Sequence, residues 1–521
     1  MYRVVSVDQM HALEQEADQQ GFSYAEMMQH AGKGLGTQIE KRFKDCSSKT
    51  LLGLVGSGNN GGDALVAMTY LQGKGWQTTA YLIKAREPQD ALVNTYLQSG
   101  GTCLAFDKDT GFRQFDAGMR AHAFLLDGIL GTGIKLPLRG SARQVMAHLH
   151  TLEDIPTTIA VDCPSGIDCD SGEVDQAAIR ADWTLCMAAV KQGMLRFPAF
   201  EKTGEISLVD IGLDQGLHAW QGIRTFCMEV SAVSRFLPKR PLQSHKGSFG
   251  TALIFAGSRN YPGAALLAGK AAYRSGAGLV RIASLPTVQQ ALAGAFPEAV
   301  WTLLNEEPDG FSWKDAQDRK AIIQSSSAIL IGPGWGKGRD TLQLFVDVLT
   351  DIFKEELASD GSRLVLDADG LNLLSENPEL LNHIPQGSVL TPHPGEMARL
   401  CGMKSAEIQT ERAGTASEYA RKWKVTLVLK GALTVVAHPD GDTVIIPVAT
   451  SALARAGSGD VLAGLITGLM AQGVEPFKAA CAGAWIHGMA GIAAERVMGQ
   501  AACVVAGDIL QAIPLVMRNI K

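Results

Sequence analysis

The spacing of strand-like and helix-like segments constrains the fold most strongly. Short apolar runs alternate with longer helical stretches along both halves of the chain. This alternation predicts βα units around parallel sheets, and therefore an α/β fold. The predicted strands are residues 51–55, 79–83, 123–126, 158–161, 183–186 and 205–210 in the first half and 251–255, 280–283, 328–331, 363–366 and 425–429 in the second.

The length of 521 residues is too great for one hydrophobic core. A less patterned segment near residues 213–243, which contains Pro238 and Pro241, separates the two α/β halves. Toward the C-terminus, the sequence pattern predicts a β-hairpin at residues 433–447. It also predicts apolar helices at residues 463–472 and 479–497. We expect layered αβα domains at residues 1–213 and 241–521, joined by a linker at residues 214–240.

Composition argues against several functional classes. Charged residues make up 19% of the chain and the net charge is −6, so no basic surface for nucleic acid is expected. No run of 18 apolar residues predicts a membrane helix, and the first ten residues lack the pattern of a signal peptide. The nine cysteines are scattered without metal-ligand spacing. We expect reduced thiols and a cytoplasmic location.

A glycine-rich loop follows the first predicted strand of the first half. The segment at residues 51–63, LLGLVGSGNNGGD, runs from a buried strand into a helix expected to begin near Ala64. Unpaired amides at a helix start, beside glycines, suit a phosphate. Gly56, Gly58 and Gly61 match GxGxxG, but a dehydrogenase needs an acidic residue after the second strand, where this chain has Lys84. A tight turn without a ligand is the structural alternative.

Polar residues follow three further strands of this half. Asp127, Asp162 with Ser165, and Lys191 all come at or just after predicted strands. In an open α/β sheet the carboxyl ends of neighbouring strands line one crevice. We therefore expect these groups to converge beside the glycine-rich loop, although Asp127 or Asp162 could instead be a buried helix cap.

Four ordered motifs in this half resemble the YjeF N-terminal family, the NAD(P)H-hydrate epimerases, over residues 1–213. They are GSGNNGGD, DGILGTGIKLPLRG, VDCPSGID and KQGMLRFPAFEKTGEISLVDIGL. The resemblance implies a Rossmann-like domain, with the catalytic Asp162 beside the nicotinamide ring. Ala64 departs from the glycine that the family often has. The implied contacts to the hydrated dinucleotide are Asn59, Asn60, Gly61, Gly62, Asp63, Gly131, Thr132, Gly133, Ile134, Lys135, Leu136, Pro137 and Asp162.

The same resemblance implies a potassium site. Asn60, Asp127 and Ser165 match the family's potassium ligands. An amide, a carboxylate and a hydroxyl offer oxygen ligands, which suit a hard cation better than zinc.

A second chemical motif, ARAGSGDVLAG at residues 454–464, is a glycine turn that opens a helix. Backbone amides there could stabilise a phosphoryl group in transfer, while Asp460 takes a proton from the attacking hydroxyl. The segment GPGWGKG at residues 332–338 lacks the spacing and the Ser/Thr of a P-loop. The alternative is that Asp460 only caps its helix.

With six further motifs this segment resembles the ribokinase-like fold, and more narrowly the NAD(P)H-hydrate dehydratases, over residues 240–515. The six are KGSFG, YPGAALLAGKAAYRSGAGLV, GPGWG, LDADGLNLL, TPHPGE and LKGALTVV. His393, held between two prolines, should aim its ring into the site. The resemblance implies that the adenine nucleotide is contacted by Lys430, Gly431, Ala432, Leu433, Thr434 and Gly459, and the hydrated cofactor by Ala264, Gly334, His393 and Asp460.

Together the two resemblances imply a metabolite repair enzyme. One half would interconvert the R and S forms of hydrated NADH or NADPH, and the other would dehydrate the S form with ADP or ATP. ADP is preferred on resemblance alone, with magnesium on the nucleotide phosphates. The resemblance also suggests a homo-oligomer. Two alternatives stay open: a ribokinase-like small-molecule kinase fused to a dinucleotide-binding domain, and a non-catalytic dinucleotide sensor.

Overall fold

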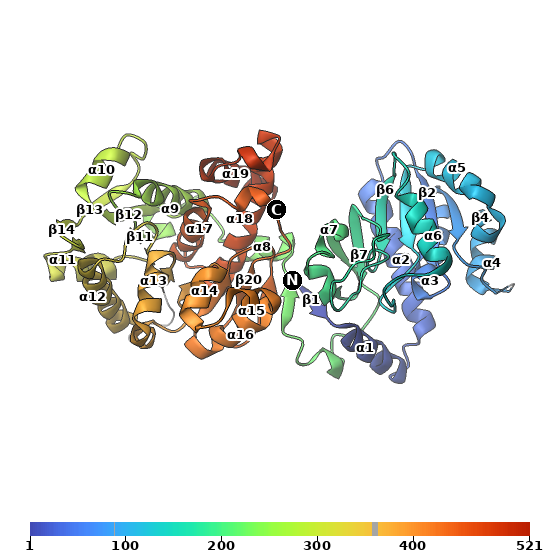
Figure 1. Ribbon diagram of the computed structural model, residues 1–521, viewed down its shortest axis with the longest axis horizontal. Coiled ribbons are helices and arrows are strands. Elements are labelled where there is room, and N and C mark those ends of the chain that lie inside the picture. The colour runs from blue at the N-terminus through green and yellow to red at the C-terminus, as the bar shows by residue number, and fades with distance from the viewer. Residues whose placement is uncertain (88, 357–362, 521) are drawn as a thin grey trace. The chain divides into compact units, whose positions relative to one another are not determined.

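The structure, a computed structural model, describes residues 1–87, 89–356 and 363–520, and its chain divides into two compact units (Figure 1). Tyr2–Ile223 form the N-terminal unit, and Arg224–Lys521 with Met1 form the C-terminal unit. The division falls inside the segment expected to be a linker. Past the division, that segment carries β10 (Thr225–Cys227) and α8 (Val230–Phe236) of the C-terminal unit.

The N-terminal unit is built on a parallel sheet with the strand order β4-β3-β2-β5-β6-β7-β9. Chain order reverses between β2 and β5, and ligands of open α/β sheets bind at such a point. A short parallel pair, β1 with β8, lies outside this sheet. The strands are β1 (Tyr2–Val5), β2 (Thr50–Val55), β3 (Gln77–Leu82), β4 (Thr102–Ala105), β5 (Phe124–Gly128), β6 (Thr157–Val161), β7 (Trp183–Met187), β8 (Val190–Lys191) and β9 (Glu205–Val209).

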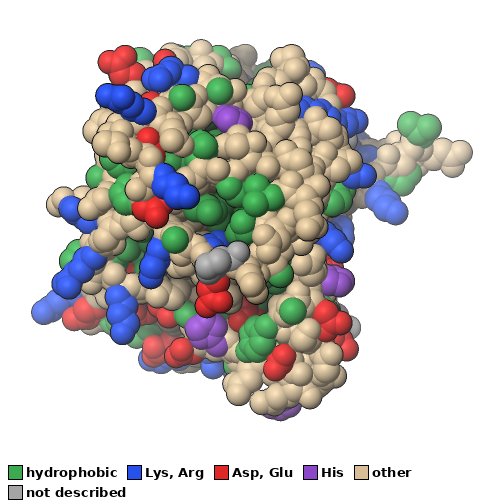
Figure 2. All heavy atoms as spheres, turned by 90° about the vertical axis from the view of Figure 1, so that its right-hand side faces the viewer, with side chains coloured by type: hydrophobic (Ala, Val, Ile, Leu, Met, Phe, Trp, Pro, Cys, Tyr) green, Lys and Arg blue, Asp and Glu red, His purple; other side chains and the backbone are tan. Residues whose placement is uncertain are grey.

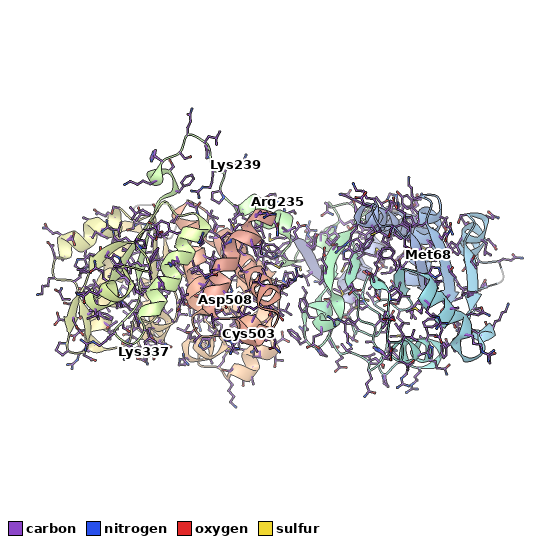
Figure 3. All side chains as sticks on the ribbon, turned by 90° about the horizontal axis from the view of Figure 1, so that it is seen from above. Met68, Arg235, Lys239, Lys337, Cys503 and Asp508 are labelled. Carbon is purple, nitrogen blue, oxygen red and sulfur yellow. The ribbon has the colours of Figure 1, made fainter. Side chains whose placement is uncertain are left out.

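Helices cover both faces of this sheet (Figure 1). One core cluster joins the sheet to α1, α2 and α3, and another joins it to α5 and α6. Met68 of α3, labelled in Figure 3, is buried against Gly53 of β2, which brings α3 close to the sheet. The helices are α1 (Val7–Gln19), α2 (Tyr24–Phe43), α3 (Asn59–Gln72), α4 (Ala91–Gln98), α5 (Arg113–Ala121), α6 (Gly140–Leu149) and α7 (Phe200–Thr203).

The C-terminal unit has the sheet order β13-β12-β11-β16-β17-β18-β19-β20-β21-β10. Neighbours from β13 to β19 are parallel, and β20 is antiparallel to β19 and β21. Chain order reverses between β11 and β16. The remaining strands are β11 (Thr251–Phe255), β12 (Leu279–Ser284), β13 (Val300–Leu303), β14 (Asn305–Glu307), β15 (Gly310–Ser312), β16 (Ala328–Ile331), β17 (Leu364–Leu366), β18 (Val389–Leu390), β19 (Thr426–Leu429), β20 (Val435–Ala437) and β21 (Thr443–Ile445).

Close packing of α9 against α17 positions the chemistry of this unit. A Cβ on Gly464 of α17 would lie 2.1 Å from the carbonyl oxygen of Ala268, so only glycine permits this approach. The first turns of both helices reach the sheet's point of reversal. The helices after α8 are α9 (Pro262–Ser275), α10 (Pro286–Leu292), α11 (Ala316–Gln324), α12 (Arg339–Glu356), α13 (Asp369–Glu376), α14 (Pro394–Cys401), α15 (Ser405–Thr410), α16 (Arg412–Trp423), α17 (Ser458–Ala471), α18 (Pro476–Met498) and α19 (Ala506–Asn519).

The predicted α/β class and the predicted strands are confirmed, with ends that shift by a few residues. Two helix starts were predicted too late. The helix expected near Ala64 begins at Asn59, so the glycine-rich segment forms its first turn. The helix expected at residues 463–472 begins at Ser458, because Gly457 takes the left-handed conformation (φ 86°) just before it.

Two further features of the folded chain are the charged side chains on its surface and the hydropathy of its helices. On the face of the N-terminal unit drawn in Figure 2, Lys and Arg side chains are interspersed with Asp and Glu. Among the described residues, no helix combines the length and the apolar character needed to span a bilayer.

Candidate active sites

In the N-terminal unit, glycines let the loops after β2 and β5 pack tightly together. A Cβ on Gly56 would lie 1.9 Å from the carbonyl oxygen of Ile129, and a Cβ on Gly61 would lie 2.1 Å from that of Gly56. Gly56 and Gly61 of the GxGxxG pattern therefore have a packing role at the sheet's point of reversal, whereas a Cβ on Gly58 would meet no atom within 4 Å. This packing leaves the amides of the first α3 turn beside the loop that follows β5.

The three predicted potassium ligands meet at this place. Ser165 Oγ donates to Asp127 Oδ1 at 2.6 Å, and the Ser165 amide donates to Asp127 Oδ2 at 2.7 Å. Asn60 Nδ2 donates to the carbonyl oxygens of Leu130 at 2.9 Å and Val161 at 2.7 Å. All three side chains are buried. The sequence was right to expect their convergence beside the glycine-rich loop.

The chemistry of this cluster fits a hard cation. Burial raises the pKa of Asp127 to about 6, while hydrogen bonds from Ser165 oppose the rise. Among the described residues, no lysine, arginine or histidine forms an ion pair with Asp127. A bound cation would therefore offset the buried charge of Asp127. Asn60 uses its amide nitrogen on carbonyls and leaves Oδ1 toward Gly131, where a Cβ would come within 2.8 Å. Asn60 and Ser165 both form hydrogen bonds with the backbone of Leu130, so the Asn60 amide lies next to the Asp127–Ser165 pair.

Asp162 is held rigidly at the end of β6. Its backbone takes φ 65°, a conformation that non-glycine residues adopt at a cost and that is common at functional sites. The Met187 amide donates to Oδ1 at 2.9 Å, and buried Lys191 forms an ion pair with the same oxygen. Burial alone would lower the pKa of Lys191, but Asp162 raises it above its ordinary value. Lys191 is therefore the charge partner of Asp162.

Two more carboxyl groups share this environment. Burial raises the pKa of Asp63 well above its usual range, and the charges of Asp162 and Glu14 add to the rise. Burial also raises the pKa of Glu14, with Lys191 opposing and Asp162 adding to the effect. The positive charge of Lys191 thus acts on three carboxyl groups, those of Asp162, Asp63 and Glu14. Sequence reasoning missed Glu14, which lies on α1 ahead of every recognisable motif.

The residues predicted to contact the dinucleotide differ in exposure and in position. Asn60, Gly61, Gly62 and Asp63 are buried, whereas Asn59 is exposed. In the loop at residues 131–137, Leu136 and Pro137 border a cavity of 660 Å³. Its other lining residues are Arg143, Glu173, Val174, Asp175, Gln176 and Pro198.

A second cavity, of 530 Å³, lies at the point of reversal in the C-terminal unit. It brings together three of the residues predicted to face the hydrated cofactor: Ala264, Gly334 and Asp460. Its other lining residues were not predicted. They are Asn260, Tyr261, Pro262, Gly263, Leu267, Asp369 and Gly457.

Asp460 is the ionisable group best suited to proton transfer in this cavity. It is the third residue of α17, in the first turn of the helix, where backbone amides lack an intrahelical partner. Burial raises the pKa of Asp460 to about 7, Asp367 and Asp369 add to the rise, and Lys430 opposes it. A carboxylate with this pKa can accept and return a proton near neutral pH.

Two of the residues predicted to contact the nucleotide, Lys430 and Gly459, lie near Asp460. Lys430 Nζ lies 2.5 Å from Asp367 Oδ1 and 3.7 Å from Glu396 Oε2. A Cβ on Gly459 would lie 3.4 Å from that ammonium, so Lys430 and Gly459 are neighbours. Leu433 takes φ 55° in the same loop, and Thr434 Oγ1 closes it by donating to the Gly431 carbonyl at 2.8 Å.

His393 takes a structural position. Its ring Nδ1 accepts the amides of Gly395 at 3.0 Å and Glu396 at 3.4 Å, which caps α14. It does not line the 530 Å³ cavity. Burial lowers the pKa of His393, and Lys430 and Arg399 lower it further, so the neutral ring dominates at pH 7. Contact with the hydrated cofactor stays a prediction.

Comparison with known proteins places the chain in a family. The NAD(P)H-hydrate dehydratase profile matches residues 252–515, and the profile described as YjeF-related protein N-terminus matches residues 24–193. The Bifunctional NAD(P)H-hydrate repair enzyme Nnr of Moorella thermoacetica is 37% identical over 501 residues, with 95% of this chain and 92% of that protein covered. The chain belongs to the bifunctional NAD(P)H-hydrate repair enzyme family.

A second relative agrees with this assignment. The protein of the same name from Escherichia coli is 32% identical, with 91% of this chain and 86% of that protein covered. A solved ADP/ATP-dependent NAD(P)H-hydrate dehydratase from Bacillus subtilis, co-crystallized with ATP/Mg2+, is 32% identical. It has a TM-score of 0.47 and covers 57% of this chain and 99% of that chain. Asp460 lies within the dehydratase match, whereas Glu14 lies before the YjeF match.

Proposed function

We propose that the N-terminal unit interconverts the R and S forms of hydrated NADH and NADPH, and that the C-terminal unit dehydrates the S form with ADP or ATP. Family membership supports both activities. The observation that carries the second one is Asp460, a proton acceptor tuned to neutral pH at the start of α17 and on the wall of a cavity.

The dehydration follows from the chemistry of the leaving group. A ring hydroxyl leaves poorly as hydroxide and well as phosphate. Asp460 takes the hydroxyl proton while the oxygen attacks the terminal phosphorus of the nucleotide, which breaks the bond to the nucleotide's bridging oxygen. The ring nitrogen's lone pair then expels phosphate, and loss of a proton from the adjacent carbon restores the dihydronicotinamide. Lys430 and the first amides of α17 balance the phosphoryl charge.

Magnesium fits this site as part of the nucleotide complex. Among the described residues, no cluster of three or more His, Cys, Asp or Glu side chains could hold a metal ion. Magnesium is commonly held by nucleotide phosphates, waters and few side chains, so it would neutralise phosphate charge during transfer.

In the N-terminal unit, Asp162 lies beside the nicotinamide ring, and the residues of the glycine-rich loop and of the loop at 131–137 hold the dinucleotide. Lys191 fixes the Asp162 carboxylate in one orientation. Asn60, Asp127 and Ser165 hold a potassium ion, which supplies positive charge next to this site. The buried Asp127 carboxylate supports this assignment, because it otherwise lacks a charge partner among the described ion pairs.

The decisive experiment supplies NADH-hydrate with ADP or ATP and follows the absorbance of reduced nicotinamide. Regenerated NADH with release of inorganic phosphate supports the proposal, and the ratio of the two rates gives the preference of the enzyme for ADP or ATP. A stable phosphorylated product would indicate a kinase instead. Binding without turnover would indicate a sensor. Separating the two epimers by chromatography, with the nucleotide left out, tests the first activity.

We also propose that the enzyme acts in the cytoplasm as a homo-oligomer. All nine cysteines are free thiols in the structure, as expected of a reducing compartment. The oligomer rests on the family resemblance alone. Light scattering of the purified chain measures it directly.

A further inference from the structure

A strained turn places two carboxylates in the C-terminal site. It consists of Asp367 and Ala368, which lie between β17 and α13, and of Asp369, the first residue of α13. Ala368 takes φ 48° and ψ −114°, a backbone region that strongly favours glycine. Such strain persists where the surroundings hold it in place, often for a functional reason. Here it turns adjacent acidic residues to different partners.

Asp369 faces the cavity and Asp367 faces Lys430. Asp369 Oδ2 accepts the Gly336 amide at 2.7 Å on the cavity wall. Asp367 is 1% exposed, and its Oδ1 accepts Lys430 Nζ at 2.5 Å and Thr391 Oγ1 at 2.8 Å. Its other oxygen, Oδ2, is buried without a hydrogen-bond partner. That oxygen points to the start of α17, where a Cβ on Gly459 would lie 3.7 Å away.

Three carboxyl groups, those of Asp367, Glu396 and Asp460, lie around the single ammonium group of Lys430. Asp367 and Glu396 contact it directly, and Asp460 is close enough to raise the pKa of Lys430 together with them, against the lowering effect of burial. On α18, buried His487 contacts Ser458 at 3.2 Å but is neutral, since burial lowers its pKa to about 4. The pKa of the half-buried His393 is lowered as well. Lys430 therefore supplies the positive charge that acts on Asp460 and lowers the pKa of its carboxyl group.

We propose that Asp367 is a positioning residue that binds the ammonium of Lys430 and so prevents it from pairing with Asp460. This inference rests on the proposed dehydration. Lys430 then serves the nucleotide phosphates, while Asp460 stays available for the hydroxyl proton. If Lys430 turned to Asp460, the ion pair would stabilise the carboxylate and weaken it as a base. The partnerless Oδ2 keeps negative charge facing α17 and opposes that rearrangement.

The test compares pH profiles of kcat/KM for dehydration of the S epimer. In the wild type the rising limb should lie near pH 7, the pKa that burial gives Asp460. Asp367→Asn has the same shape without the charge, so the limb should move to lower pH by about one unit. The KM for the nucleotide should rise, because Lys430 loses its anchor. Thr391→Val removes a hydrogen bond from the same oxygen but keeps the charge, and its limb should not move.

A double variant guards against a folding defect. Asp367→Asn leaves Lys430 buried with less compensation, whereas Asp367→Asn with Lys430→Met removes both charges. Since the charge of Asp367 also raises the pKa of Asp460 directly, the double variant is compared with Lys430→Met alone. If the shift acts through Lys430, the limbs of these two variants should coincide. An unmoved limb in folded Asp367→Asn would overturn the proposal. So would a double variant whose limb lies as far below that of Lys430→Met as the limb of Asp367→Asn lies below that of the wild type. A wild type that does not dehydrate NADH-hydrate would instead refute the proposed function, and this inference with it.

Discussion

Replacing Asp460 by asparagine should abolish dehydration and leave the fold intact. The substitution keeps the shape of the side chain but removes the proton acceptor. Loss of a general base costs about 100- to 10,000-fold in rate. At about 1.4 kcal/mol per tenfold change, this corresponds to about 3–5 kcal/mol of transition-state stabilisation. Epimerisation should continue, because its residues belong to the other unit.

Ionisation of Asp460 in its buried position lowers the stability of the fold, and Asp460→Asn removes this cost. Because burial raises the folded-state pKa of Asp460 to about 7, its neutral form is favoured in the fold. The stability that protonated Asp460 contributes to the fold is fully present below its pKa in the unfolded chain, which is near 4. This contribution is lost as the pH rises through 7. At pH 8 the ionised group costs at most about 4 kcal/mol, from about three pKa units. Asp460→Asn should therefore be at least as stable as the wild type at pH 8.

The assay follows each epimer of NADPH-hydrate by chromatography, with and without nucleotide, and records thermal unfolding at pH 6 and pH 8. Asp508→Asn is the matched control, because Asp508 (labelled in Figure 3) is also the third residue of a helix, α19, but does not line the cavity. It should lose only the modest contribution of an acidic first-turn residue. Dehydration by Asp460→Asn within about threefold of the wild type, against the loss expected for a general base, would show that Asp460 is not that base.

Three other predictions concern the N-terminal unit. Lys191→Met leaves Asp162 buried without its partner and should destabilise the unit by about 3–5 kcal/mol in urea unfolding; a loss below 1 kcal/mol would contradict the buried ion pair. Thallium-soaked crystals should show an anomalous peak among Asn60, Asp127 and Ser165, and Asp127→Asn should remove it; no peak in the wild type argues against a potassium site. A truncated chain of residues 1–223 should fold and epimerise alone, and aggregation would show that the units depend on each other.

The sequence was sufficient for the elements and for part of both sites. Parallel strands buried on both faces read as continuous apolar runs, so β2, β5 and β16 could be located directly. Polar residues at the carboxyl ends of such strands, Asp127 among them, had to meet at the sheet's point of reversal. The start of α3 was missed because glycines usually signal a loop, whereas here they form a helical turn against the loop after β5.

Residues that act through tertiary contacts could not be predicted. Glu14 has the spacing of an ordinary surface carboxylate on α1, and only the fold brings it near Lys191. Asp367 belongs to the LDADG motif, but the sequence does not show that its partner is Lys430, 63 positions away. Conversely, the prolines around His393 correctly indicate a stiff turn, yet the turn directs the ring nitrogen to the amides of α14. Local chemistry identifies candidate groups, and only tertiary structure shows their partners.

The strain at Ala368 leads to a last prediction. At φ 48° and ψ −114° the Cβ makes close contacts that glycine lacks, and such a residue costs about 1–3 kcal/mol. Ala368→Gly relieves this strain but adds about 0.5–1 kcal/mol of unfolded-state entropy. The net effect should be neutral to stabilising by about 2 kcal/mol.

Calorimetry of the full chain measures this effect on the unfolding transition of the C-terminal unit, which is recognised by its shift with ADP and magnesium. Ala64→Gly provides the comparison, because Ala64 lies inside α3 with ordinary helical geometry and glycine there should cost about 1 kcal/mol. Dehydration by Ala368→Gly should stay within a few fold of the wild type, since Asp367 and Asp369 keep their partners. A destabilisation of the C-terminal unit larger than 1 kcal/mol would mean that the turn is relaxed, and that the two carboxylates are held by their contacts alone.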